Sequence, residues 1–139
     1  MREAAVTLQL FVPGRLTNPL NGSHRHWSAR AKWAQTWRIA TQVAWLQAGQ
    51  PTWPGAAHVT FVAQVRRRFD DDNLAACIKP VRDAAVRALF GTDDGPACGH
   101  WFSYRQEVRP GRAYGVLVVV EPLPPIEQAQ DAARQATTR

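Results

Sequence analysis

The 139-residue sequence has little of several features that mark particular classes of protein. Its two cysteines, Cys77 and Cys98, are too few for a disulfide framework and lack the spacing of zinc ligands. No apolar run approaches the roughly 20 residues that a membrane-spanning helix needs, and the N-terminus lacks the pattern of a signal peptide. These absences predict a cytoplasmic protein without structural disulfides, a structural zinc ion or a membrane span.

Acidic side chains are also absent between Glu3 and Asp70. The net charge is +6 and the pI is about 10.3, and such values favour an acidic partner, of which nucleic acid is the commonest. An arginine-rich codon bias would raise the pI too, but it would not keep acids out of the first half of the chain. The basic residues in this span are Arg15, Arg25, Arg30, Lys32, Arg38, Arg66, Arg67 and Arg68.

The length and composition indicate a single folded domain. Hydrophobic residues make up 45% of the chain and charged residues 20%, which is typical of a globular protein large enough to bury a core. We expect this domain to occupy residues 1–124. Residues 125–139 are polar and are expected to form a frayed helix or a disordered tail.

Hydrophobic periodicity predicts the order strand, helix, strand, helix, strand, strand. Alternating apolar residues mark the strands, and apolar residues three or four positions apart mark the helices. A turn at 110–112 is expected to join the last two strands as a hairpin. The fold class is therefore α/β (α+β), a small mixed β-sheet with two main helices. The expected elements are strands at 6–12, 58–65, 101–108 and 114–121, and helices at about 28–48 and 73–90.

Capping residues predict where the helices begin and end. Ser28 is a suitable N-cap for the first helix and Asp72 for the second, which Gly91 is positioned to stop. Pro80 removes a backbone hydrogen bond, so either the first turn is irregular or regular helix begins near Lys79. The buried stripes are expected at Trp33, Trp37, Ala40, Val43 and Ala44 on the first helix, and at Leu74, Ile78, Val81, Ala85 and Leu89 on the second.

Six aspartates lie within 25 residues, and one residue separates the first of them from three consecutive arginines. If residues 70–72 are extended, Asp70 and Asp72 project to the same face. Asp94, or Asp93, can return to that point if the helix packs antiparallel to the strand. Three converging carboxylates suit Mg²⁺, which activates a water and stabilises a scissile phosphate, while a nearby lysine neutralises the transition state. The aspartates are Asp70, Asp71, Asp72, Asp83, Asp93 and Asp94.

Each of these features also has a structural interpretation. Runs of acids often cap helices or lie in solvent. Lys79 and Asp83 stand four residues apart, which is the spacing of an ion pair on a helix surface. The three arginines at 66–68 are expected to contact phosphates, and a solvated strand end is the alternative.

The combined pattern resembles the RusA-type Holliday-junction resolvases, a family common in phages and prophages. The family signature is Asp-x-Asp-Asn-Leu, then a Lys and an Asp four apart on a helix, then a paired Asp. The family's Pro- and Asn-rich loop is similar to residues 13–27, with Asn18 or Asn21 as the conspicuous Asn. Three residues, 75–77, intervene before the lysine, which departs from the family pattern. The matching residues are Asp70, Asp72, Asn73 and Leu74, then Lys79 and Asp83, then Asp93 and Asp94.

The resemblance implies a Mg²⁺-dependent endonuclease that resolves Holliday junctions by symmetric paired nicks, as a homodimer and without an organic cofactor. Mn²⁺ is expected to substitute for Mg²⁺. The implied metal ligands are Asp70, Asp72 and Asp94. Lys79 is the implied catalytic lysine, with Arg82 as the next candidate. The expected DNA-binding residues are Arg66, Arg67, Arg68, Asn18, Asn21, Arg25, Arg30 and Lys32.

Two other functions stay open. One is a non-catalytic nucleic-acid-binding module, in which the acids are helix caps and solvated turns. The other is a nuclease of the same fold that acts on flaps or replication forks. Cleavage of a synthetic junction in Mg²⁺, compared with EDTA, separates the first of these from the resolvase.

Overall fold

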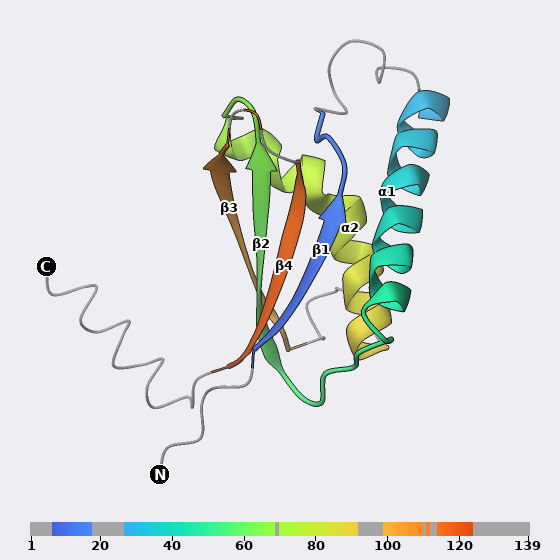
Figure 1. The fold of residues 1–139 in the computed structure, drawn as a ribbon, viewed down its shortest axis with the longest axis vertical. Helices are drawn as coiled ribbons and strands as arrows, with labels where there is room; N and C mark the ends of the chain where they lie inside the picture. Colours follow the sequence, from blue (N-terminus) through green and yellow to red (C-terminus); the bar gives the residue numbers. More distant parts are fainter. Residues whose placement is uncertain are drawn as a thin grey trace, which may run out of the picture.

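The computed structural model describes residues 7–17, 27–68, 70–91, 99–109, 111 and 114–123, without the side chains of Asp71 and Asp72. These residues form one four-stranded sheet with two helices, in the predicted order (Figure 1). The predicted α+β class with a mixed sheet is therefore confirmed. The elements are β1 (Leu8–Pro13), α1 (Trp27–Gln47), β2 (Ala57–Val65), α2 (Asp71–Phe90), β3 (Trp101–Val108) and β4 (Gly115–Pro122).

The strands lie in the order β1-β4-β2-β3. β2 and β3 are parallel, whereas β4 runs antiparallel to both of its neighbours, β1 and β2. The predicted hairpin between the last two strands is therefore wrong, because β2 lies between them. Three strands, β1, β2 and β3, consequently point in one direction and β4 points in the other.

The apolar pattern of β4 explains its central place. Val116, Val118 and Val120 are fully buried on one face, and Leu117 and Val119 are half-buried on the other. A strand that is apolar on both faces is stabilised by neighbours on both sides. β3 has more polar and exposed residues, and such a strand is better suited to the edge of the sheet.

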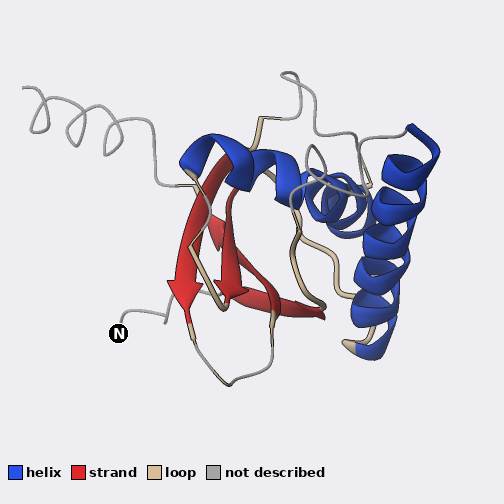
Figure 2. Ribbon diagram, turned by 90° about the horizontal axis from the view of Figure 1, so that it is seen from above, coloured by secondary structure: helices blue, strands red, loops and turns tan. Residues whose placement is uncertain are grey.

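Both helices pack on the same face of the sheet (Figure 2). Alternate residues of β2 that face the helices, from Ala57 through Phe61 to Val65, are buried, as the alternation predicts. The five apolar residues predicted for the stripe of α2, from Leu74 to Leu89, are buried against them. In the part of the chain that the structure describes, neither helix is long and apolar enough to cross a membrane.

The first helix differs from its prediction in two respects. It already includes Trp27, so Ser28 lies inside the helix and is not its N-cap. Trp37 and Ala44 are buried as predicted, but Val43 is 44% exposed. Thr41 is buried instead, and its hydroxyl donates a hydrogen bond to the carbonyl of Trp37 at 2.7 Å. This bond lets a polar residue occupy the buried stripe.

The second helix begins earlier than predicted. Asp70, rather than Asp72, is its N-cap residue, and the helix runs without a break from Asp71 through Pro80 to Phe90. Regular helix therefore begins before Lys79. The end is as predicted, because Gly91 adopts the left-handed conformation (φ 70°) and its N–H bonds the carbonyl of Arg87.

Candidate nucleic-acid and metal site

One end of the sheet collects the elements that carry the predicted site. Because β1, β2 and β3 are mutually parallel in direction, their carboxyl ends meet at the same end of the molecule. Both helices also begin there, at the upper end in Figure 1. This arrangement brings together the chain after β1, the three arginines after β2 and the start of α2.

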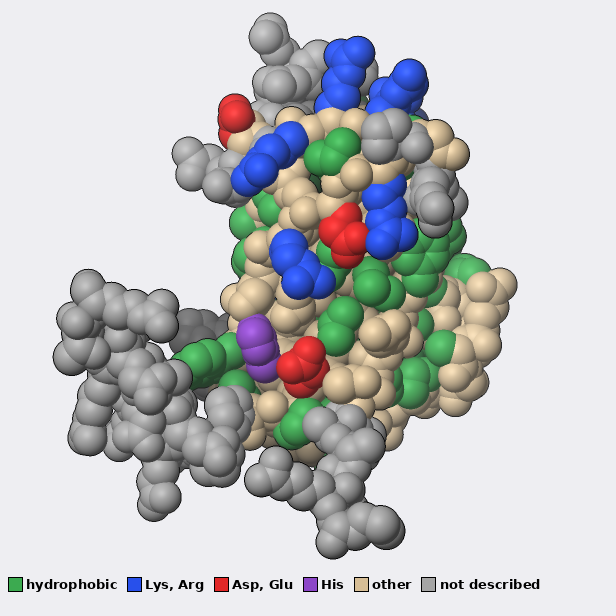
Figure 3. Space-filling view, turned by 60° about the vertical axis from the view of Figure 1, so that its left-hand side comes forward, with side chains coloured by type: hydrophobic (Ala, Val, Ile, Leu, Met, Phe, Trp, Pro, Cys, Tyr) green, Lys and Arg blue, Asp and Glu red, His purple; other side chains and the backbone are tan. Residues whose placement is uncertain are grey.

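Basic side chains are concentrated at this end. Figure 3 shows Lys and Arg side chains gathered over the upper half of one face, where β2 and β3 end. Three predicted DNA-binding residues, Arg66, Arg67 and Arg68, are exposed directly after β2, and Arg30 and Lys32 are exposed on the first turns of α1. The other predicted ones, Asn18, Asn21 and Arg25, lie outside the described residues.

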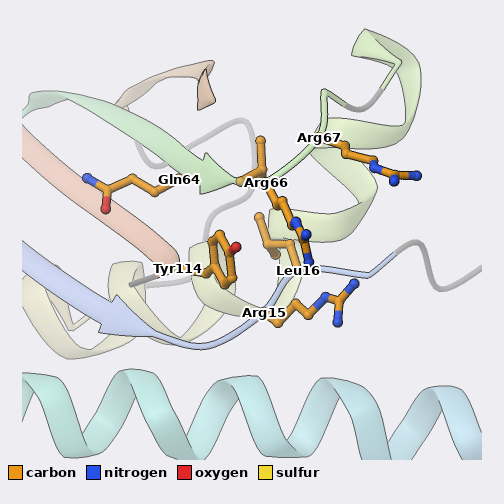
Figure 4. A pocket seen from close by; sticks show the side chains of 7 residues that line it. Arg15, Leu16, Gln64, Arg66, Arg67 and Tyr114 are labelled. Atoms are coloured by element: carbon orange, nitrogen blue, oxygen red, sulfur yellow. The ribbon is translucent and has the colours of Figure 1, made fainter. Parts of the chain in front are cut away.

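A hollow of about 290 Å³ lies at the ends of β1, β2 and β4 (Figure 4). A backbone hydrogen bond of 3.0 Å from the N–H of Gly14 to the carbonyl of Tyr114 joins the two chain segments at its rim. Three of the described residues that line it are arginines, and none of these described residues is acidic. The lining residues are Arg15, Leu16, Gln64, Val65, Arg66, Arg67 and Tyr114.

The sequence reasoning did not assign Arg15 or Tyr114 to a site. Arg15 follows the Pro13-Gly14 turn that ends β1, and Tyr114 directly precedes β4. The direction of β4 brings Tyr114 to the end where β1 stops. Only the pairing of β4 with β1 places Tyr114 beside Arg15. The hairpin of β4 with β3 that the sequence predicted did not require β4 to pair with β1.

Asp70 stands at this end with its carboxylate available. It has an extended backbone (φ −64°, ψ 142°), its side chain makes no capping hydrogen bond, and it is exposed. Its backbone carbonyl instead accepts the N–H groups of Asn73 and Leu74, at 3.0 and 3.1 Å. An uncapped carboxylate at the positive end of a helix dipole is well placed to accept a cation or water without breaking a structural bond.

The argument that Asp70 and Asp72 project from one face of an extended segment is wrong. Asp71 and Asp72 belong to the first turn of α2, where residues two apart do not face each other. The side chain of Asp72 lies outside what the structure describes. Its role as a metal ligand therefore stays a prediction that rests on the resemblance.

Asp94 and Asp93 lie outside the described residues. Gly91, the nearest described residue before them, follows the 20 residues of α2, a helix about 30 Å long. Gly91 and Asp70 are consequently at opposite ends of this helix. Among the described residues, no group of three His, Cys, Asp or Glu side chains is positioned to hold a metal ion.

Lys79 lies on α2, nine residues after Asp70, which is about 13 Å along the helix axis. Its ammonium pairs with the carboxylate of Asp83 at 3.3 Å, and the two side chains are 58% and 28% exposed. The predicted ion pair is confirmed. The residues at 75–77 form a regular turn of the helix, so they displace Lys79 along it by one turn.

Two other residues named from the sequence, Arg82 and Cys77, are held by contacts within the fold. Arg82 hydrogen-bonds the hydroxyl of Tyr104 and lies over the ring of Phe102, at 5.7 Å from its centroid. Cys77 is fully buried, and burial raises the pKa of its thiol to about 11. Such a thiol stays protonated at neutral pH and is therefore a poor nucleophile.

Comparison with protein-family models and with curated proteins gives no match to this chain. The resemblance to the resolvase family therefore rests on the residues of the motif.

Proposed function

We propose that this chain is a Mg²⁺-dependent endonuclease that cuts branched DNA, with the four-way junction as its substrate. One observation carries the proposal: an exposed carboxylate without a structural partner among the described residues, Asp70, stands at the same end of the sheet as Arg15, Arg66 and Arg67. A surface that binds phosphates beside an available carboxylate is the combination that a metal-dependent nuclease needs.

The donor atoms fit the ion. Mg²⁺ prefers carboxylate oxygens and keeps several waters, and the exposed carboxylate of Asp70 leaves room for both. We propose that Asp70 and Asp72 hold it. Asp94 stays a prediction of the resemblance alone, because Gly91, three residues before it, lies at the other end of α2 from Asp70. When bound, the ion supplies Lewis-acid activation of a water and of the scissile phosphate.

The chain's own cations orient the substrate. Arg66 and Arg67 precede Asp70 by four and three residues, so a phosphate that they bind is held beside the carboxylate. Their guanidinium groups can each donate two parallel hydrogen bonds to phosphate oxygens. Lys79 is retained as the proposed catalytic lysine on the resemblance, while its ion pair with Asp83 supports a structural role.

The test is cleavage of a synthetic four-way junction in Mg²⁺ and in EDTA. The parent is expected to cut only in Mg²⁺. Asp70→Asn should abolish cleavage while junction binding is kept or strengthened, because a carboxylate that repels phosphate has been neutralised. Glu121→Gln is the matched control, since Glu121 is an exposed carboxylate on β4 opposite His58, at the end of the sheet away from Asp70. Cutting by Asp70→Asn within a few-fold of the parent would contradict the proposal.

A non-catalytic DNA-binding module is the second candidate. The structural pairing of Lys79 and the position of Asp71 and Asp72 in the first turn of a helix favour it, because acids there stabilise the helix dipole. Binding without cleavage in either Mg²⁺ or Mn²⁺ would select this candidate. The third candidate is a nuclease of the same fold that acts on flaps or replication forks. Cleavage of flap and fork substrates, compared with cleavage of the junction, distinguishes it.

A homodimer is proposed because a two-fold protein matches the two-fold junction. α1 offers a surface for it: Ile39, Val43 and Leu46, four and three residues apart, are 49%, 44% and 53% exposed. Leu46 also lines a groove of about 750 Å³ between α1 and α2 that carries both Arg38 and Asp83. If this surface contacts the same surface of a second copy across a two-fold axis, Arg38 of each copy can pair with Asp83 of the other.

A further inference from the structure

We propose that the hollow lined by Arg15, Gln64, Arg66 and Tyr114 holds one unpaired nucleotide of the DNA substrate. In this arrangement Arg15 and Arg66 bind the phosphate, and the ring of Tyr114 stacks on the base. This inference rests on the proposed function, because it takes DNA as the partner and adds which part of the DNA is recognised.

The lining favours a nucleotide over a bare phosphate. Three arginines, with no acid among the described lining residues, attract a phosphate, but a phosphate alone makes no use of the remaining side chains. Leu16 and Val65 are 5% and 4% exposed and give the hollow an apolar base. Tyr114 is half-buried and adds an aromatic ring. Apolar walls with a few polar groups are typical of sites for organic ligands.

The side chains that line the hollow place positive charge on one side of the Tyr114 ring. In Figure 4 the guanidinium groups of Arg15 and Arg66 project to the same side of Tyr114, and Gln64 lies on its other side. The hydrogen bond between Gly14 and the carbonyl of Tyr114 fixes the distance between the segments that carry Arg15 and the ring. A nucleotide has the same division, with an anionic phosphate at one end and a flat base at the other.

The size and position select a single, unstacked nucleotide. A volume of about 290 Å³ is at the lower limit of sites for organic ligands, roughly 300–1,000 Å³. Bases inside a duplex are stacked on both faces, so Tyr114 can stack only on a base that has left the helix. Such bases occur where strands exchange, and Asp70 follows Arg67 by three residues, so the held nucleotide would lie close to the proposed cleavage site.

The experiment measures binding of the full chain in EDTA, so that no DNA is cut. The probes are a fluorescein-labelled 12-nucleotide single strand and the 12-base-pair duplex of the same sequence. Tyr114→Leu should weaken binding of the single strand about tenfold, the effect of losing one stacked base, and change binding of the duplex less than twofold. Tyr114→Phe keeps the ring and should bind like the parent.

Arg15→Gln tests the phosphate end. It should weaken binding of both probes and reduce the slope of log affinity against log salt by about one. Arg105→Gln is the matched control, because Arg105 is an exposed arginine of β3 that does not line the hollow. Thermal melting of each variant identifies those that fail to fold. If Tyr114→Leu does not fold, the competition assay below, which uses the parent protein, still tests the site.

Competition separates the two parts of the ligand. Thymidine monophosphate should displace the single strand at concentrations where inorganic phosphate and thymidine do not. Equal competition by inorganic phosphate, or equal loss of both probes in Tyr114→Leu, would overturn the nucleotide site. These binding outcomes do not depend on catalysis. If they are observed but the parent does not cut the junction, the nuclease proposal is wrong and the nucleotide site is kept. If the parent cuts the junction but these binding outcomes are not observed, only the nucleotide site is wrong.

Discussion

The indole of Trp37 lies against Gly14 so closely that a Cβ on Gly14 would stand 2.7 Å from the ring carbon Cη2. Gly14 also has a φ of +148°, which residues with a side chain rarely adopt. This contact attaches the middle of α1 to the chain segment that carries Arg15. The basic hollow therefore depends on a buried residue that does not line it.

Replacement of Gly14 should disturb both stability and DNA binding. We expect Gly14→Ala to lower the free energy of unfolding by about 1–3 kcal/mol, from backbone strain and the clash with Trp37. Urea denaturation measures this. Gly55→Ala is the control, because Gly55 has a φ of +80° and a Cβ added there would meet nothing within 4 Å. Equal losses in the two variants would show that Trp37 contributes nothing.

The Lys79–Asp83 pair predicts a small effect on stability. Both side chains are partly exposed, so a double-mutant cycle with Lys79→Ala and Asp83→Ala should give a coupling of only about 0.3–0.5 kcal/mol, and less at high salt. Single-turnover cleavage tests the other role of Lys79. A fall in rate far larger than the fall in DNA affinity would establish a catalytic lysine, and a rate within a few-fold of the parent would remove Lys79 from the site.

His100 predicts a loss of stability in mild acid. Its Nδ1 accepts the N–H of Ala57 at 3.1 Å, its ring stacks on Phe90 at 3.9 Å, and burial lowers its pKa below the usual 6.5. A lowered pKa means that the unfolded chain binds the proton more readily, so this stabilisation is present above about pH 6.5 and is lost as the pH falls through the folded pKa.

The free energy of unfolding of His100→Phe should accordingly change less between pH 8 and pH 5 than that of the parent. The variant keeps the stacking on Phe90 and cannot titrate. An NMR titration of the His100 ring in the parent gives the pKa directly. A value above 6.5, or identical pH dependence in the two proteins, would contradict the expectation.

The exposed face of α1 predicts the behaviour of the proposed dimer. Leu46→Lys should shift the mass measured by analytical ultracentrifugation from dimer to monomer, because it places a charge in an apolar contact. Gln47→Lys is the control on the same turn of α1. A parent that sediments as a monomer at all concentrations would exclude the dimer, and an unaffected Leu46→Lys dimer would exclude this surface.

Local patterns predicted the elements well and their arrangement less well. The buried stripe of α2 and the left-handed Gly91 follow from spacing and from the glycine itself. The partners of β4 did not follow, because pairing depends on which strand buries both faces, and the uninterrupted run of five apolar residues from 116 to 120 was the signal for a central strand.

The candidate site shows the same division. The sequence located Asp70 and the three arginines, since they are neighbours in the chain. It misjudged the geometry of Asp72, because the helix starts at Asp71 once the carbonyl of Asp70 accepts two backbone N–H groups. Arg15 and Tyr114 meet only through the antiparallel pairing of β1 and β4, which no local pattern contains.

The place of β4 also governs the order in which this protein can mature during synthesis. β1 leaves the ribosome before the other described strands, yet the only described strand that pairs with it is β4, about 100 residues later. Until then β1 has no partner and the apolar edge of β2 that β4 covers is open. Such long-range pairing slows folding and exposes strand edges to other chains. Nascent chains that end before residue 115 should therefore depend on chaperones, and the described sheet should close only after β4 has been synthesised.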